Sequence, residues 1–565
     1  MIRERVQASI DRCFALGIEQ GLWTDAAASA YTVEESRREG QGDYATNLAM
    51  VVAGLEKRRP REVAESLLGL LIDASGVNSA ESAAAEADNL FAKVEVAGPG
   101  FVNCFIRPEV WHSVIPEIRR QGAEYGRSQL GRGRKVLVEF VSANPTGPLS
   151  VGHGRQAVLG DAIARLLSAT GYVVTREYYY NDAGRQMRVL GESVRARYLE
   201  LLLWPFTFPE DGYQGEYIRE IAQALVTEQG EALTTVTDYA PFTRKAEEVI
   251  FADINHTLAR MGICFDNYYN ERSLYQQGLV DDVVAALREK NLVYELDGAL
   301  WFKTGELGLE QDRVIIKSSG EPTYRLPDIA YHREKFRRGY DWLVNIFGSD
   351  HIATIPDVLA GVKALGYDPE RVSTVIHQFV TLVRDGKPIK MSTRKANFVT
   401  VDQLLAEVGV DATRFFFLMR KADSQLEFDL NLATRQSQEN PVYYVQYAHA
   451  RLCSVFRQAA RQGLGSTSEV ALDYGRLELA EELMLLRTMA AMPALLASAA
   501  QALEPHRLVF YLQDLAARFH GYYNRHRLIG DDPGLSRARL ALAEALRVVL
   551  ANGLKLIGVK APEKM

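Results

Sequence analysis

One segment of the sequence, residues 135–180, limits the fold more than any other. It opens with an apolar run, KVLVEFVS at 135–142, passes through a loop rich in proline and glycine, and continues as a helix-forming stretch from Val151 to Thr170. A second apolar run, YVVTREYYY at 172–180, follows at once. A strand, a helix and a strand within about 45 residues predict a parallel βαβ unit.

Further apolar runs after this unit alternate with helical patterns, as in a doubly wound α/β domain. The strand candidates are ALWFKT (299–304), RVIIKS (313–318), DWLVNIFG (341–348) and STVIHQFVTLV (373–383). We therefore expect a Rossmann-type, doubly wound α/β core over residues 135–430, with helical insertions around 190–290.

The two flanks of this core have different patterns. Residues 1–118 begin with a helix, continue with helical spacing in GDYATNLAMVVAGLEKRRPREVAESLLGLL, and end in a hairpin, FAKVEVAGPGFVNCFI, which together predict a small α+β domain. Residues 119–134 are rich in glycine and arginine and predict a linker. Residues 431–565 contain four long amphipathic stretches and predict an all-α bundle.

Composition narrows the class of protein. Among 565 residues, 47% are hydrophobic and 24% are charged, which excludes a disordered or collagen-like chain. The net charge of −7 argues against a sequence-blind nucleic-acid coat, although a local basic surface can still bind phosphate. No uninterrupted apolar run approaches the roughly 18–20 residues of a membrane helix. We expect a soluble, cytoplasmic protein.

The four cysteines make a thiolate metal site improbable on pattern alone. Cys13, Cys104, Cys264 and Cys453 lie far apart, and no CxxC pair is present. Structural zinc sites use closely paired thiolates, so we predict no protein-bound metal of this kind. Scattered reduced thiols fit a reducing compartment.

The loop ANPTGPLSVGHGRQ joins the first strand of the core to its helix. In doubly wound folds this position binds nucleotides, because backbone N–H groups and the helix dipole face an anion there. Gly152 leaves room for a flat base, and His153 in the first helical turn can donate to a phosphate. A tight turn with a capped helix explains the same residues without a ligand. Neither GxGxxG nor GxxxxGK[ST] is present.

A second segment, VRDGKPIKMSTRKANFVT at 383–400, concentrates positive charge just after a strand. Its cations are Lys387, Lys390, Arg394 and Lys395. Such a loop suits the neutralisation of a triphosphate as pyrophosphate leaves. A solvated basic loop without function is the alternative.

Together these two segments, about 240 residues apart, resemble the two signatures of the class I aminoacyl-tRNA synthetases. Segments along nearly the whole chain resemble the bacterial arginyl-tRNA synthetases: GDYATNLAM, VEFVSANPTGPLSVGHGR, REYYYNDAGRQM, SGEPTYRLPDIAYHREKF, GVDATRFFFLMRKADSQLEFDL, NPVYYVQYAHAR and the terminal APEKM. The resemblance implies an N-terminal domain that reads the tRNA D-loop, a catalytic core and a C-terminal anticodon-binding domain. It also implies the cofactors ATP and Mg²⁺, the partners L-arginine and tRNA(Arg), and a monomer.

The resemblance also implies the residues of the activation site. Catalysis would fall to Ser150, His153 and Lys390, and ATP binding to those three with Gly152, Met391 and Ser392. Arginine binding would fall to Glu139, Ser142, Asn144, Tyr324, Asp328 and His351. A guanidinium is planar, permanently charged and rich in donors, so it requires carboxylates in a bidentate arrangement.

For tRNA, the resemblance implies contacts from both flanking domains. Phe101 and Asn103 would contact the D-loop, whereas Tyr447, Arg451, Tyr523 and Met565 would contact the anticodon. Aromatic side chains with arginine suit stacking on unpaired bases. An aromatic side chain on a helix is also often part of the core, and this alternative stays open for Tyr523.

The chain departs from the family pattern around the activation site. Ser150 stands where the family usually has the first histidine of its signature, and Thr393 where a lysine is often found. Ile352 and Ala353 replace a usual histidine and glycine, and Arg325 adds a positive charge near the expected pocket for a cation. Losing one transition-state donor costs about 10²–10³ in rate.

Three hypotheses remain from the sequence. In the first, the protein is a working arginyl-tRNA synthetase with a weaker or re-tuned activation step. In the second, it is a paralogue that binds tRNA, regulates, or serves specialised arginine metabolism. In the third, it is a small-molecule adenylyltransferase, which the well-matched C-terminal helices and Met565 argue against.

Overall fold

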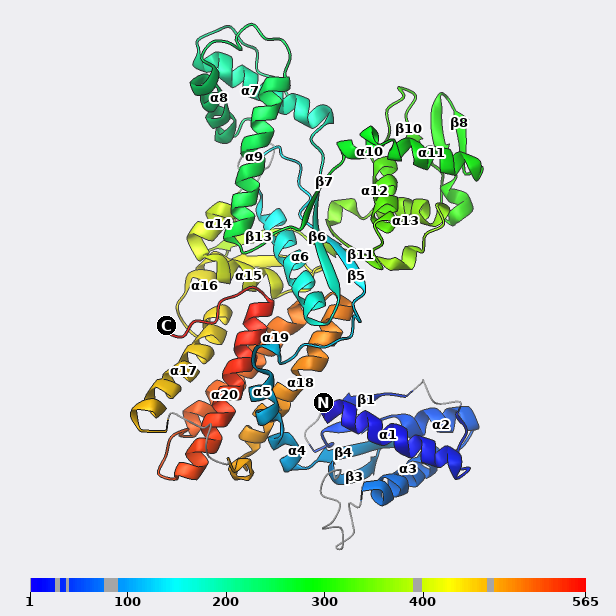
Figure 1. Ribbon diagram of the computed structural model, residues 1–565, viewed down its shortest axis with the longest axis vertical. Helices are drawn as coiled ribbons and strands as arrows, with labels where there is room; N and C mark the ends of the chain where they lie inside the picture. The colour runs from blue at the N-terminus through cyan, green and yellow to red at the C-terminus, as the bar shows by residue number, and fades with distance from the viewer. Residues whose placement is uncertain (1, 26–30, 37–39, 76–89, 390–398, 465–471) are drawn as a thin grey trace.

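The chain folds around one parallel sheet in a computed structural model (Figure 1). The structure describes residues 2–25, 31–36, 40–75, 90–389, 399–464 and 472–565. The N-terminal unit, in blue, and the C-terminal bundle, in orange and red, lie below the sheet in Figure 1, and the helical insertion with α7, α8 and α9 rises above it.

Five parallel strands form the core sheet in the order β12-β11-β5-β6-β7. They are β5 (Lys135–Glu139), β6 (Val173–Tyr180), β7 (Asn267–Asn270), β11 (Trp342–Gly348) and β12 (Val372–His377). Helix α6 (Val151–Ala169) connects β5 to β6, so the predicted βαβ unit and the doubly wound fold are confirmed. Since the chain leaves β5 toward β6 on one side and later fills β11 on the other, the strand order reverses beside β5, where such sheets bind ligands.

Two predicted strands do not belong to this sheet. The runs at 299–304 and 313–318 form β9 (Ala299–Phe302) and β10 (Arg313–Ile316), which pair antiparallel in a separate small sheet with β8 (Val293–Leu296). Their apolar character predicted a strand correctly, but sheet membership depends on distant partners that the local pattern does not specify.

The predicted strand at 373–383 is divided in two. Its first part is β12, and its second part is β13 (Val380–Arg384), which pairs with β14 (Lys387–Pro388) and runs parallel to β15 (Leu426–Asp429). The chain changes sheets at Gln378, whose N–H donates to the Ala422 carbonyl at 3.0 Å. The break brings β13, which leads into the basic loop, beside the core sheet.

Helices cover and extend the core. Those between β6 and the small sheet are α7 (Gly184–Leu201), α8 (Glu216–Gln229), α9 (Ala240–Arg260), α10 (Arg272–Gln276) and α11 (Leu279–Glu289). Those that follow are α12 (Arg325–Arg337), α13 (Ile355–Ala364), α14 (Val401–Val408), α15 (Val410–Leu418) and α16 (Leu430–Thr434). Helix α12 packs on α11 and α13 and carries the predicted Asp328.

The N-terminal unit is an α+β domain with one sheet in the order β1-β2-β4-β3. Its elements are α1 (Ile2–Glu19), β1 (Val33–Glu35), β2 (Tyr44–Thr46), α2 (Leu48–Glu56), α3 (Pro60–Ser75), β3 (Phe91–Ala97) and β4 (Phe101–Ile106). The predicted hairpin is β3–β4. The purely helical prediction for the segment that begins GDYATNLAM is wrong at its start, because Tyr44–Thr46 pairs with β4.

The expected linker is partly helical and docked. After α4 (Pro108–His112), helix α5 (Val114–Gln121) extends into it. The Tyr125 hydroxyl then donates to the Met489 carbonyl at 3.0 Å, and the Asn552 amide donates to the Gly122 carbonyl at 2.9 Å. This segment therefore ties the N-terminal unit to the bundle.

The four predicted C-terminal helices are all present. They are α17 (Pro441–Arg461), α18 (Ala480–Ala502), α19 (His506–Arg525) and α20 (Pro533–Leu556). Among the described residues, α18 alone is long and apolar enough to span a membrane, but it packs against α19, α20 and α6. Its apolar surface is thus part of the interior of the bundle.

Candidate active site

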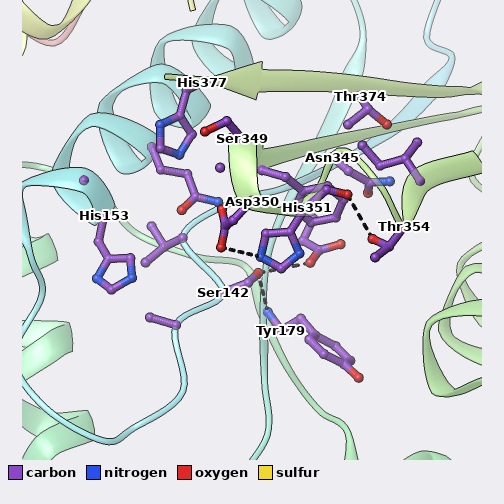
Figure 2. Close-up of a pocket in the computed structure, with 18 of the residues that line it drawn as sticks. Ser142, His153, Tyr179, Asn345, Ser349, Asp350, His351, Thr354, Thr374 and His377 are labelled. Carbon is purple, nitrogen blue, oxygen red and sulfur yellow. Dashed lines mark hydrogen bonds and ion pairs between the residues drawn. The ribbon is translucent and has the colours of Figure 1, made fainter. Parts of the chain in front are cut away.

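A cavity of about 970 Å³ opens at the carboxyl ends of β5, β6 and β11, beside the reversal of strand order. Figure 2 shows side chains from the β5–α6 loop, β6, β11 and β12 around it. Nine predicted site residues line this cavity: Glu139, Ser142, Asn144, Ser150, Gly152, His153, Tyr324, Asp328 and His351. Lys390, Met391 and Ser392 lie outside the described residues.

The chain turns sharply where β5 ends. Val141 and Ser142 have φ angles of 68° and 44°, in the left-handed region that β-branched residues in particular avoid. Hydrogen bonds hold the turn: the Ser142 hydroxyl donates to Glu139 Oε1 at 3.1 Å and accepts from the Tyr179 N–H at 3.2 Å. The turn directs the following loop, with Asn144, along the cavity wall.

Carboxylates gather at one end of the cavity. Asp328 on α12 lies near Glu139 and Glu271, and burial with repulsion from these two raises the pKa of Asp328 to about 7. Burial also raises the pKa of Glu271, although the Tyr179 hydroxyl donates to its Oε2 at 2.8 Å. Carboxylates that resist ionisation in a shared site gain most from a bound cation.

Aromatic rings form one wall at this acidic end. The Tyr331 ring lies 4.4 Å from that of Tyr179 and 4.8 Å from that of Tyr269, measured between centroids. The Tyr331 hydroxyl donates to Glu177, which also accepts two hydrogen bonds from Arg338. Glu177 is therefore neutralised behind the rings. In this wall Tyr331 is buried, and the half-buried Tyr179 ring is the flat surface on which a guanidinium can stack.

The opposite end of the cavity is built on the first turn of α6. Ser150 is its N-cap: the His153 N–H donates to Ser150 Oγ at 3.4 Å, and the Ser150 N–H donates to His153 Nδ1 at 3.2 Å. Burial lowers the pKa of His153, so the ring is neutral and its proton lies on Nε2. Near Gly152, an added Cβ would meet only Ser150 Oγ, at 3.6 Å.

Other histidines complete this end. Burial lowers the pKa of His377 to about 4, so this ring is also neutral near pH 7. The His351 ring stacks on Phe347 at 5.4 Å, and its Nε2 lies 3.6 Å from the Asp350 carboxylate. Neutral histidine donors and a helix N-terminus suit the binding of a phosphate chain. They stabilise its negative charge through partial positive charges on N–H groups.

The structure corrects one expectation about the pocket. Arg325 does not line the cavity; its Nε donates to the buried Asp357 carboxylate at 2.6 Å, which also accepts from Arg313 at 3.0 Å. Arg325 is therefore ion-paired outside the cavity lining and shares the single carboxylate of Asp357 with Arg313. Local sequence patterns do not predict this pairing, because Asp357 lies 32 residues from Arg325.

Arg155 is a buried residue that the sequence reasoning missed. Its guanidinium donates to the Gln378 carbonyl at 2.7 Å and to the Lys421 and Ser424 carbonyls at 3.0 Å each. These bonds fix the chain between β12 and β13, just before the basic loop. The only signal in the sequence was its position two residues after His153.

On the bundle, three of the predicted tRNA residues lie together. The Arg451 guanidinium lies 4.6 Å from the Tyr447 ring centroid and 4.7 Å from that of Tyr523. Arg451 also contacts His520 at 3.1 Å, a residue the sequence reasoning missed. Met565 is exposed at the end of the chain. Tyr523 is therefore partly packed, yet its ring faces an arginine.

In the N-terminal unit, the two predicted tRNA residues differ in exposure. Phe101 is 39% exposed, whereas Asn103, on the part of β4 that pairs with both β2 and β3, is only 4% exposed. Phe101 thus offers surface to a partner, and Asn103 offers little.

Comparison with known proteins gives a consistent result along the whole chain. Three family models match: the arginyl tRNA synthetase N-terminal domain over residues 1–106, the catalytic domain of class I (R) tRNA synthetases over 114–427, and the DALR anticodon binding domain over 445–565.

Individual relatives cover the chain from end to end. An arginine–tRNA ligase of Desulfotalea psychrophila is 60% identical over 565 residues, with all of both chains aligned. That of Syntrophotalea carbinolica is 45% identical over all of this chain and 99% of its own. The Thermus thermophilus arginyl-tRNA synthetase structure shares the fold, with a TM-score of 0.76 and 23% identity over the full length of both chains.

Proposed function

Since the chain belongs to the arginyl-tRNA synthetases, it attaches L-arginine to tRNA(Arg) with consumption of ATP, and we propose that the cavity described above is the site of activation and transfer. The relatives at up to 60% identity do not favour the paralogue hypothesis. One observation carries the site proposal: a single cavity has an acidic, aromatic end and, at its opposite end, a helix N-terminus.

Arginine binds with its guanidinium at the acidic end. Asp328 and Glu271 supply the carboxylates, and the half-buried Tyr179 ring, stacked on Tyr331, supplies the stacking surface. Its amino and carboxylate groups then lie toward Asn144, whose Oδ1 accepts from the Asn181 N–H at 3.1 Å and whose amide donates to Gln186 at 2.9 Å. This orientation points the carboxylate of the substrate toward the nucleotide end.

ATP binds over the first turn of α6. The adenine lies against Gly152, where the backbone is open, and the phosphates face His153 and the start of the helix. Lys390 in the basic loop, with Met391 and Ser392 beside it, neutralises the departing pyrophosphate. Mg²⁺ arrives bound to the triphosphate, since its preferred ligands are oxygens of phosphate and water.

The reaction then needs positioning and charge stabilisation more than covalent chemistry by the protein. The arginine carboxylate attacks the α-phosphorus in line, pyrophosphate leaves, and arginyl-adenylate remains. A ribose hydroxyl of the terminal adenosine of tRNA next attacks the acyl carbon and releases AMP. In this family, activation commonly requires bound tRNA.

The remaining assignments follow the same logic. Phe101 and Asn103 belong to the proposed D-loop surface, and Tyr447, Arg451, Tyr523 and Met565 to the proposed anticodon surface. We assign residues 1–118, 119–134, 135–430 and 431–565 to the D-loop domain, linker, catalytic domain and anticodon domain. The protein acts as a cytoplasmic monomer.

Asp328→Asn tests the orientation of arginine. In arginine-dependent ATP–pyrophosphate exchange with tRNA(Arg) present, we expect kcat/KM for arginine to fall by at least about 100-fold, because a charge-assisted contact is lost, while KM for ATP stays within about twofold. Asp281→Asn, on exposed α11, is the matched control and should behave as wild type. Unchanged use of arginine by Asp328→Asn would overturn the site.

A further inference from the structure

A lysine lies fully buried beneath the acidic end of the cavity. Lys335 is on α12, seven residues after Asp328, and none of its surface is exposed. Its Nζ donates to Glu139 Oε2 at 2.5 Å and to Asn345 Oδ1 at 2.9 Å, and lies 4.1 Å from the centroid of the Tyr331 ring. Burying an ammonium is costly unless it is paired and hydrogen-bonded, and here it is both.

Hydrogen bonds continue from this lysine to the substrate cavity. The Asn345 amide donates to His332 Nε2 at 2.9 Å, and His332 Nδ1 donates to the Asp328 carbonyl at 2.8 Å. Burial and the nearby ammonium of Lys335 lower the pKa of His332 to about 3, so this ring carries no charge. Lys335 is thus linked to Glu139 on β5 and, through two neutral groups, to the turn of α12 that carries Asp328.

The charges at this end can be counted. Glu139 from β5, Glu271 after β7 and Asp328 from α12 are negative when ionised, and Lys335 is positive. The other titratable groups near them are neutral or paired. Burial raises the pKa values of Tyr179 and Tyr331 well above 10 and also raises that of Tyr275, while Glu177 is paired with Arg338 and Asp182 with Arg272. Above the pKa of Asp328, about 7, three negative charges and one positive charge leave two negative charges. This net charge equals that of the two carboxylates, Asp328 and Glu271, that the proposed function assigns to the guanidinium.

We propose that Lys335 is a positioning residue that sets the charge of the arginine pocket: it compensates Glu139, so that the carboxylates of Asp328 and Glu271 are left for the guanidinium of the substrate. This inference rests on the proposed function, because it takes the acidic end as the arginine site. Without the ammonium, the three carboxylates would bind a proton more tightly, and that proton would compete with arginine at higher pH.

The pH profile of kcat/KM for arginine measures this charge directly. For Lys335→Met we expect its midpoint to move up by about one to three pH units, because an opposite charge close to the carboxylates is lost. KM for arginine at pH 7 should then rise about tenfold for each unit of that shift, and KM for ATP should not change. Glu139→Gln keeps the lysine and removes one negative charge, so its midpoint should move down.

The double variant Glu139→Gln/Lys335→Met is the decisive comparison. It restores the count of two negative charges, so its midpoint should return to within about half a pH unit of wild type. A thermal unfolding curve for each variant shows whether the enzyme is folded. If Lys335→Met does not fold, the pH midpoint of the double variant is compared with that of Glu139→Gln. The upward shift between these two variants measures the loss of the Lys335 charge.

Two results would overturn the role of Lys335: single variants whose midpoints both stay at the wild-type value while thermal stability falls, or midpoints that move in the same direction. Either would make the lysine a structural residue only. The Asp328→Asn variant separates this from a failure of the proposed function. If Asp328→Asn still uses arginine as wild type does, the proposed site is wrong. If Asp328→Asn loses arginine use but the pH midpoints of Lys335→Met and Glu139→Gln do not move in opposite directions, only the inference on Lys335 is wrong.

Discussion

At the arginine end of the cavity, three carboxylates and a buried ammonium lie among tyrosine rings, whereas the nucleotide end is lined by neutral histidines, a serine hydroxyl and the first turn of α6. The first end uses ionisable side chains, of which Glu139 and Lys335 are buried and Asp328 and Glu271 are half-buried. The second uses partial charges on a helix N-terminus, and the proposed cationic contribution comes from the loop that holds Lys390.

This difference matches the two ligands. A guanidinium is permanently charged and planar, so a rigid arrangement of carboxylates recognises it without changing during the reaction. A triphosphate changes its charge distribution as pyrophosphate leaves, and donors that stabilise developing charge are then more useful than fixed ions. Specificity for arginine and catalysis of phosphoryl transfer are therefore expected to respond to different variants.

Among the variants not yet discussed, Glu271→Gln should produce the largest difference between the two ends. The change removes one negative charge but keeps an oxygen to accept from the Tyr179 hydroxyl. We expect KM for arginine to rise by about 10- to 150-fold, the value of a hydrogen bond to a charged group, and KM for ATP to stay within about twofold. Steady-state exchange with tRNA present measures both constants.

Glu289→Gln, on the exposed surface of α11, is the matched control for Glu271→Gln. Equal increases in the KM values of arginine and ATP would contradict the separation of the two ends. They would show that Glu271 supports the whole cavity rather than the guanidinium.

The next largest expected effect is a difference in pH dependence between kcat/KM for arginine and KM for ATP. Asp328, with a pKa of about 7, is protonated below pH 7 and then cannot pair with a guanidinium. We expect kcat/KM for arginine to fall about tenfold for each unit below pH 7 and to level off above it, since this constant reports the free enzyme. Between pH 6 and 8, His377, with a pKa of about 4, stays neutral, so KM for ATP should be nearly constant.

Measurements of kcat/KM for arginine and of KM for ATP in a constant-ionic-strength buffer test this. In Asp328→Asn, the fall of kcat/KM for arginine below pH 7 should be absent. An ATP profile that followed the arginine profile would mean that one titrating group controls both ends.

Local sequence predicted the nucleotide end better than the arginine end. Ser150, Gly152 and His153 follow a strand and begin a helix, so a short stretch of chain fixes their place. The arginine end is assembled from residues far apart in sequence. Glu271 follows β7, a four-residue strand with no apolar run, and was therefore missed.

Lys335 was missed for a related reason. A lysine in a helix is usually exposed, and nothing within α12 marks this one as buried. Its partner Glu139 lies 196 residues away, and Asn345 lies on another strand. The same limit applies to β9 and β10, whose strand character was predicted correctly but whose sheet was not, because the partners of a strand are set by the assembled fold.

Ser150→Ala should have the smallest effect and gives the finest test of the nucleotide end. Ser150 Oγ caps α6 and contacts His153, so its loss should cost about 1 kcal/mol and reduce kcat about fivefold through displacement of His153. Ser150→Thr keeps the capping oxygen and should stay within about twofold of wild type. A fall of about 10²–10³ in kcat for Ser150→Ala, with α6 still folded by circular dichroism, would instead mark this hydroxyl as a direct transition-state donor. The nucleotide end would then depend on one side chain as strongly as the arginine end depends on Asp328.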